Sequence, residues 1–279
     1  MQQFVTINGK IEDIHTPVFT SDNRAFMYGD ALFETIRVMN GTPLFFEDHM
    51  NRLLDGMAFL QMKLKPEWDP VFFKTQIQNL LNKNKHTSSA RVRFEVYRLP
   101  GGYYTPSNPD IGFVLQTEEL SSNSFELNTK GVNIDIYKDT SKPLGKLSNL
   151  KSSNSLCYVL AGIYKTQKGL DDCLLLNTNG NIAETISSNI FIVRNGELFT
   201  PSLNEACVAG VMRTQVLKIA KTHKKKIHEG CLTTDDLLKA DEIFLTNAIT
   251  GITWVVAFRS KRFFNSTAKW FSEQLNFLI

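Results

Sequence analysis

The stretch Lys151-Ser152-Ser153-Asn154-Ser155-Leu156 is the most informative part of this sequence of 279 residues. It lies just before an apolar run that we expect to form a helix. Glu184 follows it, and Gly210-Val211-Met212-Arg213 follows Glu184. Between the last two lies Ser187-Ser188-Asn189-Ile190-Phe191, which we expect to end a strand-turn-strand unit. The order of these segments, more than any one of them, carries information.

A lysine, a carboxylate and a glycine at the start of a helix can each bind a different chemical group. The lysine amine can form a Schiff base with an aldehyde, and the carboxylate can hold a ring nitrogen protonated. The start of a helix can receive a phosphate, because its free amide groups point toward an incoming anion. Pyridoxal phosphate carries all three groups, so these positions predict three contacts with one cofactor.

Each of these residues also has a structural interpretation. Most lysines lie on the surface, and Lys142 and Lys146 compete with Lys151 for a catalytic role. Glu184 follows the Asn179-Gly180 turn and would ordinarily be a solvated hairpin residue. Arg52 would ordinarily be an exposed arginine on a helix whose other face is apolar. A catalytic lysine needs partial desolvation to be neutral when it attacks.

Bulk composition excludes several classes of protein. Apolar residues make up 42% of the chain, and the net charge is 31 − 28 = +3, too small to indicate nucleic-acid binding. The basic cluster His223-Lys224-Lys225-Lys226 is best interpreted as a solvated helix end. No window approaches about 18 uninterrupted apolar residues. We therefore expect a cytoplasmic protein with no membrane or nucleic-acid partner.

The four cysteines, Cys157, Cys173, Cys207 and Cys231, stand singly. Without a Cys-x-x-Cys pair or a histidine at ligand spacing, they indicate neither a zinc site nor a disulfide framework. We expect no metal.

The pattern of the chain predicts an α/β (α+β) protein with two domains. Ala90 to Tyr97 alternates apolar and polar residues as a half-buried strand does, and Glu47 to Leu60 has helical periodicity. We expect further helices starting near Asn154 and over Val211–His223, Thr234–Lys239 and Thr267–Leu278, a strand over Val132–Tyr137, and hairpin turns at Asn179-Gly180 and Asn195-Gly196. The predicted division is a smaller N-terminal α/β domain over residues 1–118, a linker over 119–130, and a larger C-terminal domain over 131–279.

The sequence resembles the class IV aminotransferases, the fold type IV pyridoxal-phosphate enzymes, over nearly its whole length. Six ordered blocks carry the resemblance: Arg24 to Thr35, His49-Met50-Asn51-Arg52-Leu53, Lys151 to Leu156, the Glu184 hairpin, Gly210 to Arg213, and Thr246-Asn247-Ala248. The family has a D-amino-acid-transaminase-like architecture with the cofactor in the cleft between its domains. Its members act on small amines and are typically homodimers.

The resemblance implies a role for individual residues. Lys151, selected over Lys142 and Lys146 by the asparagine three places after it, would be the catalytic lysine, and Glu184 would contact the pyridine nitrogen. The remaining residues expected at the cofactor are Arg52, Ser188, Asn189, Val211, Met212, Asn247 and Ala248. Met212 and Ala248 stand where transaminases usually have threonines, so phosphate binding would depend on Arg52 and backbone amides. Tyr28, Phe33 and Arg98 are candidates for binding substrate.

Two activities within the family remain open. Lys151-x-x-Asn154-x-Leu156, Tyr28-Gly29-Asp30 and Gly210 to Arg213 look most like aminodeoxychorismate lyase, which forms 4-aminobenzoate and pyruvate. The segment from Arg98 to Tyr104 lacks the Arg-x-His carboxylate trap of D-amino-acid transaminases. A transaminase for branched-chain or related amino acids, with 2-oxoglutarate as partner substrate, is the alternative. A non-catalytic alternative is a scaffold that binds the cofactor without turnover, which the presence of both Lys151 and Glu184 disfavours.

Overall fold

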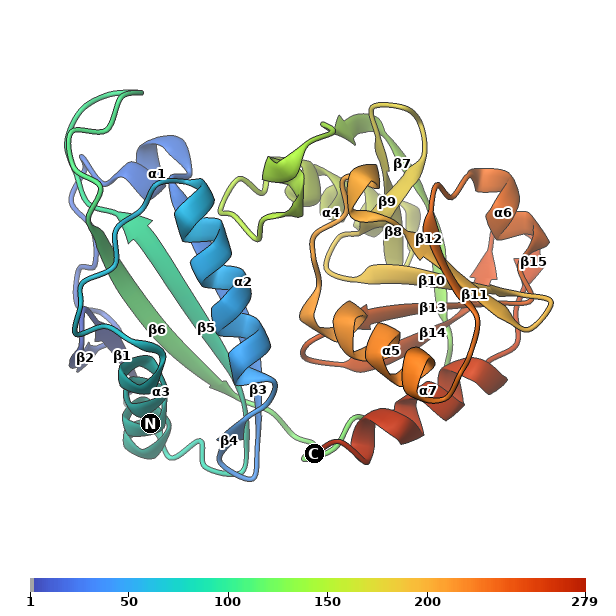
Figure 1. Cartoon of the computed structure of the whole chain (residues 1–279), viewed down its shortest axis with the longest axis horizontal. Coiled ribbons are helices and arrows are strands. Elements are labelled where there is room, and N and C mark those ends of the chain that lie inside the picture. The colour runs from blue at the N-terminus through green and yellow to red at the C-terminus, as the bar shows by residue number, and fades with distance from the viewer. Residues whose placement is uncertain (1–2) are drawn as a thin grey trace. The chain divides into compact units, whose positions relative to one another are not determined.

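The computed structural model describes residues 3–279, and contacts divide the chain into two compact units. Unit 1 comprises Met1–Asn123 and Lys151–Asn154, and unit 2 comprises Ser124–Leu150 and Ser155–Ile279. The chain therefore passes from one unit to the other three times (Figure 1). The short segment that returns to unit 1 begins with Lys151.

Unit 1 is built on a six-stranded sheet in the order β2-β1-β6-β5-β3-β4. Its strands are β1 (Phe4–Ile7), β2 (Lys10–Asp13), β3 (Ala31–Met39), β4 (Thr42–Pro43), β5 (Ser89–Arg98) and β6 (Ile111–Glu119). All neighbouring strands are antiparallel. The alternation in β5 is confirmed, because Ala90, Val92, Phe94 and Val96 are fully buried.

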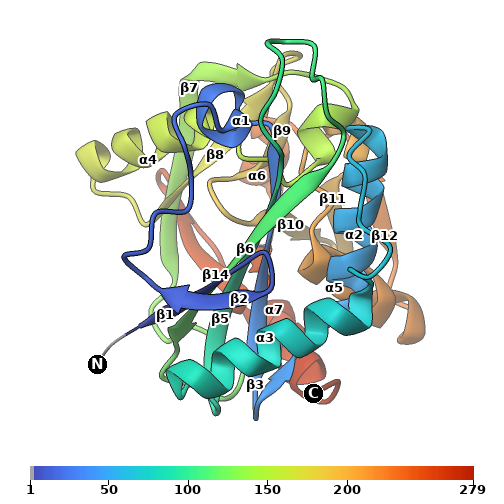
Figure 2. The ribbon, with the colours of Figure 1, turned by 90° about the vertical axis from the view of Figure 1, so that its left-hand side faces the viewer.

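Helices α1 (Arg24–Tyr28), α2 (Phe46–Phe59) and α3 (Pro70–Asn84) complete unit 1. Figure 2 shows α3 crossing the strands, where it contacts β1 and β6, while α2 lies along β3. Asp69 caps α3 by accepting a hydrogen bond from the Phe72 amide at 2.7 Å. The core under α3 is aromatic: Phe73 lies 4.7 Å from Phe94 and 5.1 Å from Phe113, measured between ring centroids.

Unit 2 is built on a nine-stranded sheet in the order β12-β11-β10-β13-β14-β7-β8-β9, with β15 paired to β14. Its strands are β7 (Val132–Lys142), β8 (Asp172–Asn177), β9 (Ile182–Thr185), β10 (Asn189–Arg194), β11 (Glu197–Pro201), β12 (Ile227–Gly230), β13 (Glu242–Asn247), β14 (Gly251–Phe258) and β15 (Lys261–Arg262). The sheet curls, so that β9 also lies against β10.

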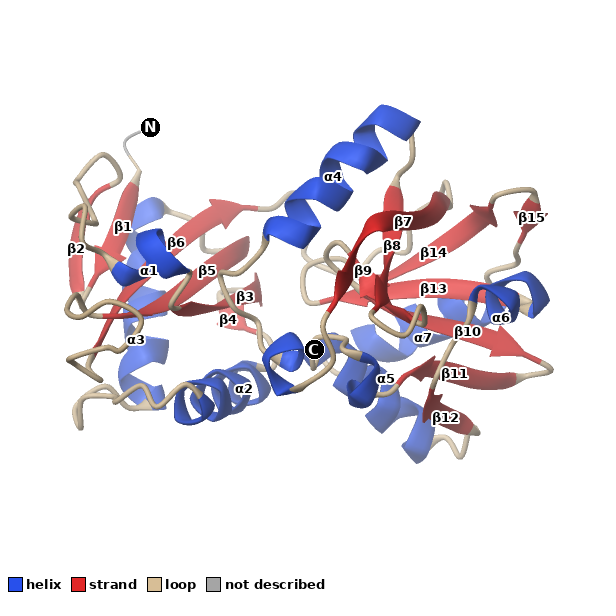
Figure 3. Cartoon of the chain, turned by 90° about the horizontal axis from the view of Figure 1, so that it is seen from above, coloured by secondary structure: helices blue, strands red, loops and turns tan. Residues whose placement is uncertain are grey.

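Helices cover the sheet of unit 2 on both sides. They are α4 (Leu156–Lys168), α5 (Val211–Thr222), α6 (Thr234–Lys239) and α7 (Ser266–Asn276), with short 3-10 turns at Lys146–Asn149 and Leu203–Glu205. Figure 3 places α4 on one side, against β7 and β8, and α5 and α7 on the other, against β13 and β14. One apolar cluster, including Ile134, Leu174, Ile190 and Phe258, forms the core enclosed by the curled sheet.

The predicted helices and hairpin turns are confirmed, with ends shifted by one or two residues. Two features differ from the expectation. The first residue of the predicted linker, Glu119, is the last residue of β6. Farther along the predicted linker, Phe125 is buried, 2% exposed, with its ring against Gly251 and its backbone bonded to the Asn276 side chain of α7.

Candidate active site

Glu184 lies on β9 with its carboxylate buried, at 3% exposure. Its register partner on β8 is Leu175, which packs toward α4, so the Glu184 side chain faces α4 as well. Three donors reach the carboxylate. The Tyr158 hydroxyl donates to Oε1 at 2.7 Å, the Val208 amide donates to Oε2 at 2.9 Å, and the Lys142 ammonium donates to Oε1. The alternative of a solvated hairpin residue is therefore wrong.

Lys142, at the end of β7, is the cation that compensates Glu184. It is 3% exposed, and its Nζ also donates to the Ser148 carbonyl at 3.3 Å. Sequence reasoning treated Lys142 only as a competitor of Lys151 and missed this contact. The spacing of the residues gave no signal for it, because the contact depends on β7 and β9 lying on either side of β8 in the same sheet.

The charge on Glu184 raises the pKa values of two neighbouring groups, Tyr158 and Cys207. Burial raises the pKa of the Tyr158 hydroxyl, and the Glu184 carboxylate raises it further, so this hydroxyl stays protonated and donates. Burial and then Glu184 raise the pKa of the Cys207 thiol to about 11. Neither group is a nucleophile at neutral pH. Tyr158 was not among the residues expected at the site.

Gly210 precedes α5 in a position that admits no side chain. A Cβ atom there would lie 1.9 Å from Asn189 Oδ1, while Asn189 Nδ2 donates to the Val208 carbonyl at 2.9 Å. Val211 and Met212 follow at 4% and 1% exposure. The first amides of a helix have no carbonyl partner within the helix, so this end of α5 can bind an anion.

Ser188 and Asn247 are brought together where β10 begins and β13 ends. Asn247 Nδ2 donates to Ser188 Oγ at 3.0 Å, and Asn247 Oδ1 accepts from the amides of Ile249 and Thr250. Ala248 lies within that turn. Beside them on β13, the Thr246 hydroxyl is buried and has no hydrogen-bond partner among the described residues. The structure thus groups Glu184, Ser188, Asn189, Asn247 and the start of α5 at one end of the sheet.

Lys151 belongs to unit 1, where its segment runs beside β3. The Phe33 amide donates to the Lys151 carbonyl at 2.9 Å, and the Ser153 amide donates to the Ala31 carbonyl at 3.0 Å. The Lys151 Nζ lies 4.4 Å from the centroid of the Phe33 ring. Backbone bonds to a strand therefore hold this lysine in place, as a catalytic lysine requires.

Arg52 on α2 is joined to the buried Glu34 of β3. Arg52 Nε donates to Glu34 Oε1 at 2.8 Å, and its Nη2 donates to Oε2. His49 Nδ1 lies 2.6 Å from the same Oε2. The Arg52 side chain is 14% exposed, so it is not the freely solvated arginine of the structural interpretation. Its predicted role at the phosphate stays a prediction.

Arg98 and Tyr28 lie at the base of the loop over residues 100–107. Arg98 is 5% exposed and donates to Asp30 and to the carbonyls of Leu60 and Gln61. These bonds use three of the five N–H groups of the guanidinium. Tyr28 packs against Tyr104, with ring centroids 5.5 Å apart. The substrate contacts of Tyr28, Phe33 and Arg98 stay predictions.

Comparison with known proteins identifies the family. The family model for class IV amino-transferases matches residues 31–258. The chain belongs to the class IV aminotransferase family. Two curated relatives are each 28% identical: a probable branched-chain-amino-acid aminotransferase of Aquifex aeolicus, covering 98% of this chain and 89% of the relative, and an aminodeoxychorismate lyase of Vibrio harveyi, covering 88% of each. The solved structure of the branched-chain aminotransferase from Thermoproteus uzoniensis with norvaline has the same fold, with TM-score 0.87, 22% identity, and 98% and 93% of the two chains covered.

As a class IV enzyme, the protein uses pyridoxal phosphate, and the residues of unit 2 fit this cofactor. A carboxylate has about four acceptor positions, and three described donors reach Glu184, which leaves one position for a ring nitrogen. The first amides of α5, which follow Gly210, have no carbonyl partner within the helix and can bind a phosphate. The unpaired Thr246 hydroxyl adds a buried donor at the same end of the sheet.

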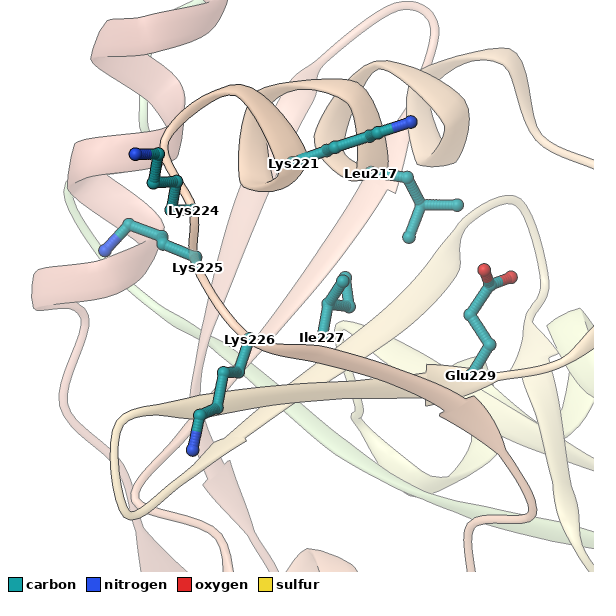
Figure 4. Close-up of a pocket in the computed structure, with 7 residues that line it drawn as sticks. All are labelled: Leu217, Lys221, Lys224, Lys225, Lys226, Ile227 and Glu229. Carbon is teal, nitrogen blue, oxygen red and sulfur yellow. The ribbon is translucent and has the colours of Figure 1, made fainter.

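A basic pocket in unit 2 is a separate feature from these residues. Figure 4 shows it at the end of α5, lined by Leu217, Lys221, Lys224, Lys225, Lys226, Ile227 and Glu229, with the lysine side chains pointing in different directions. Lys226 pairs with Glu197, and Lys225 lies over the Trp270 ring. Across residues 3–279, no helix has the length and apolar character needed to cross a membrane, and no group of histidine, cysteine and acidic residues could hold a metal ion.

Proposed function

We propose that this class IV enzyme is a lyase that converts 4-amino-4-deoxychorismate to 4-aminobenzoate and pyruvate. A single contact carries the proposal. Asn154 Nδ2 donates to the Gly29 carbonyl at 3.2 Å, and a Cβ on Gly29 would lie 2.8 Å from Asn154 Oδ1. Gly29 also has a φ of 65°, which favours glycine. Two blocks look most like the lyase: Tyr28-Gly29-Asp30 and Lys151-x-x-Asn154-x-Leu156. They are in direct contact through Gly29 and Asn154.

Arg98 argues against a D-amino-acid transaminase. That activity uses an Arg-x-His pair to bind the substrate carboxylate, but here Arg98 is followed by Leu99 and Pro100 and is buried. A branched-chain transaminase is the second candidate, favoured by the Aquifex relative, which is as similar to this chain as the Vibrio lyase is.

Each proposed contact has a distinct task. When bound, pyridoxal phosphate supplies an electron sink for the substrate carbon that carries the amine. Lys151 holds the cofactor and accepts the proton that leaves that carbon. Glu184 holds a proton at the ring nitrogen, and the amides at the start of α5 bind the phosphate together with Arg52. In the lyase, loss of the enolpyruvyl group and formation of an aromatic ring complete the reaction.

Lys151, and not Lys142, is the proposed attachment point. In the cofactor the ring nitrogen and the carbon bearing the aldehyde are on opposite sides of the ring. A lysine that contacts Glu184 thus lies at the end away from the aldehyde. Borohydride reduction and peptide mapping should place the pyridoxyl group on Lys151. Finding it on Lys142 or Lys146 would overturn the assignment.

A single-turnover experiment separates the lyase from the transaminase. The lyase should release pyruvate and 4-aminobenzoate in equal amounts from 4-amino-4-deoxychorismate with no keto acid present. A transaminase given leucine or glutamate alone stops after half a cycle, with the cofactor in its amine form. Such stalling, together with no pyruvate from 4-amino-4-deoxychorismate, would overturn the lyase and favour the second candidate. Cytoplasmic location and a homodimer stay predictions, the latter measurable by light scattering.

A further inference from the structure

Lys142 has no task in the proposed reaction, yet it is as deeply buried as Glu184. Burying an ammonium is strongly unfavourable unless a partner compensates its charge. Its described partners are Glu184 Oε1 and the Ser148 carbonyl, and its Nζ lies 5.2 Å from the centroid of the Tyr158 ring. Lys142 and Tyr158 both donate to the same oxygen of Glu184, Oε1.

The donors are divided unevenly between the two carboxylate oxygens. Oε1 accepts from Lys142 and Tyr158, whereas Oε2 accepts from the Val208 amide. With two acceptor positions on each oxygen, the remaining position is on Oε2. A ring nitrogen would therefore meet Oε2, with the ammonium behind the carboxylate on the other oxygen.

We infer that Lys142 is a positioning residue that confines the proton shared by Glu184 and the cofactor ring to the ring nitrogen. This inference rests on the proposed contact between Glu184 and that nitrogen. A proton on the carboxylate would lie closer to the ammonium than a proton on the ring would. Repulsion between like charges is stronger at the shorter distance, so the ammonium drives the proton toward the ring. Tyr158 and Val208, both neutral, supply hydrogen bonds without this repulsion.

The test uses pyridoxal phosphate labelled with ¹⁵N in the ring, whose chemical shift reports whether the nitrogen is protonated. In the wild-type holoenzyme at neutral pH, the resonance should be that of a protonated ring. In Lys142→Met the resonance should move toward the value of a neutral pyridine. In Lys142→Arg, which keeps the positive charge, it should stay at the wild-type value. Lys226→Met is the matched control, because its ammonium pairs with Glu197 at the surface. It should leave the resonance unchanged.

Several results would overturn the inference. A role in stability alone predicts a lower melting temperature for Lys142→Met with an unchanged ¹⁵N resonance. If this variant does not fold, Lys142→Gln, which keeps a neutral donor for Glu184, carries the same comparison. In the apoprotein, Lys142→Met should lower the melting temperature more than Lys142→Met combined with Glu184→Gln does. Additive effects would show that the ion pair does not exist.

Glu184→Gln separates failure of this inference from failure of the proposed function. It should remove the protonated resonance, because glutamine cannot balance the charge of the ring. If that variant keeps the wild-type resonance, or if the wild type binds no cofactor, the proposed function fails and the inference falls with it. If Glu184→Gln behaves as expected and Lys142→Met resembles the wild type, only the inference fails.

Discussion

At the scale of single residues, Glu34 is the clearest case of a charge fixed by its neighbours. Burial by itself would raise its pKa, but Arg52 and His49 outweigh burial and lower the pKa from 4.5 to about 2. The folded-state pKa is thus below the unfolded value. The ion pair therefore contributes stability that is fully present above about pH 4.5 and is lost as the pH falls through about 2.

Glu34→Gln should remove this contribution, since it leaves Arg52 without its carboxylate. We expect a loss on the order of 3 kcal/mol in the free energy of unfolding at neutral pH. Between neutral pH and about pH 3, the variant should also lose less stability than the wild type. Urea unfolding at both conditions measures the two effects. Glu118→Gln, which breaks the exposed pair with Arg91, is the control and should change stability by less than about 1 kcal/mol. Equal acid dependence in wild type and Glu34→Gln would contradict the argument.

At the scale of elements, the start of α5 depends on Gly210. Gly210→Ala would place a methyl group 1.9 Å from Asn189 Oδ1, so the asparagine must move and its bond to the Val208 carbonyl is lost. We expect a loss of about 1–3 kcal/mol in stability, measured by denaturant unfolding. Gly162→Ala in α4 is the matched control, because a Cβ there meets nothing within 4 Å. It should stabilise the protein by up to about 1 kcal/mol. Equal effects of the two alanines would be evidence against close packing at Gly210.

The conformation of the loop over residues 100–107 depends on hydrogen bonds from Arg24. This buried arginine donates to Asp30 and, through Nη1, to the carbonyls of Gly101, Gly102 and Tyr103. Lysine has no planar fork and cannot reproduce these bonds. Arg24→Lys should therefore loosen the loop and speed chymotrypsin cleavage at Tyr103 and Tyr104, which are 82% and 91% exposed. Arg91→Lys, on the exposed side of β5, should leave the cleavage rate unchanged. Unchanged cleavage in Arg24→Lys would show that other contacts hold the loop.

Local signals predicted the elements well, and long-range contacts poorly. Asn195-Gly196 forms its hairpin because both residues adopt positive φ, 52° and 76°, which is a property of the two residues alone. The capping box of α6, Thr233 with Asp236, is likewise local. The pairing of Lys142 with Glu184 depends on the order β7-β8-β9 and on a register shift between Leu175 and Leu176, neither of which is written in the spacing of the residues.

At the scale of the whole molecule, the chain crosses between its units at Asn123–Ser124, Leu150–Lys151 and Asn154–Ser155. Near each crossing, hydrogen bonds hold the chain to at least one of the two units. Lys151 and Ser153 are bonded to β3 in unit 1, and Phe125 is anchored in unit 2. Two backbone bonds within unit 1 thus fix the proposed catalytic lysine, although Leu150 and Ser155 on either side of it belong to unit 2.

Phe125 holds the chain to unit 2 just after the first crossing. Its ring packs so closely on Gly251 of β14 that a Cβ there would lie 2.7 Å from the ring, and Asn276 of α7 bonds its amide and carbonyl. Phe125→Ala should cost about 3–5 kcal/mol, because it empties a buried aromatic site. Hydrogen exchange should rise in the peptides of β14 and α7 more than in β3 and β5, whose core lies in unit 1. Phe264→Ala, which truncates a ring 77% exposed in unit 2, is the control and should leave exchange unchanged. Unaltered protection of α7 in Phe125→Ala would mean that this helix is held by its contacts with α5 and the sheet, and not by the crossing segment.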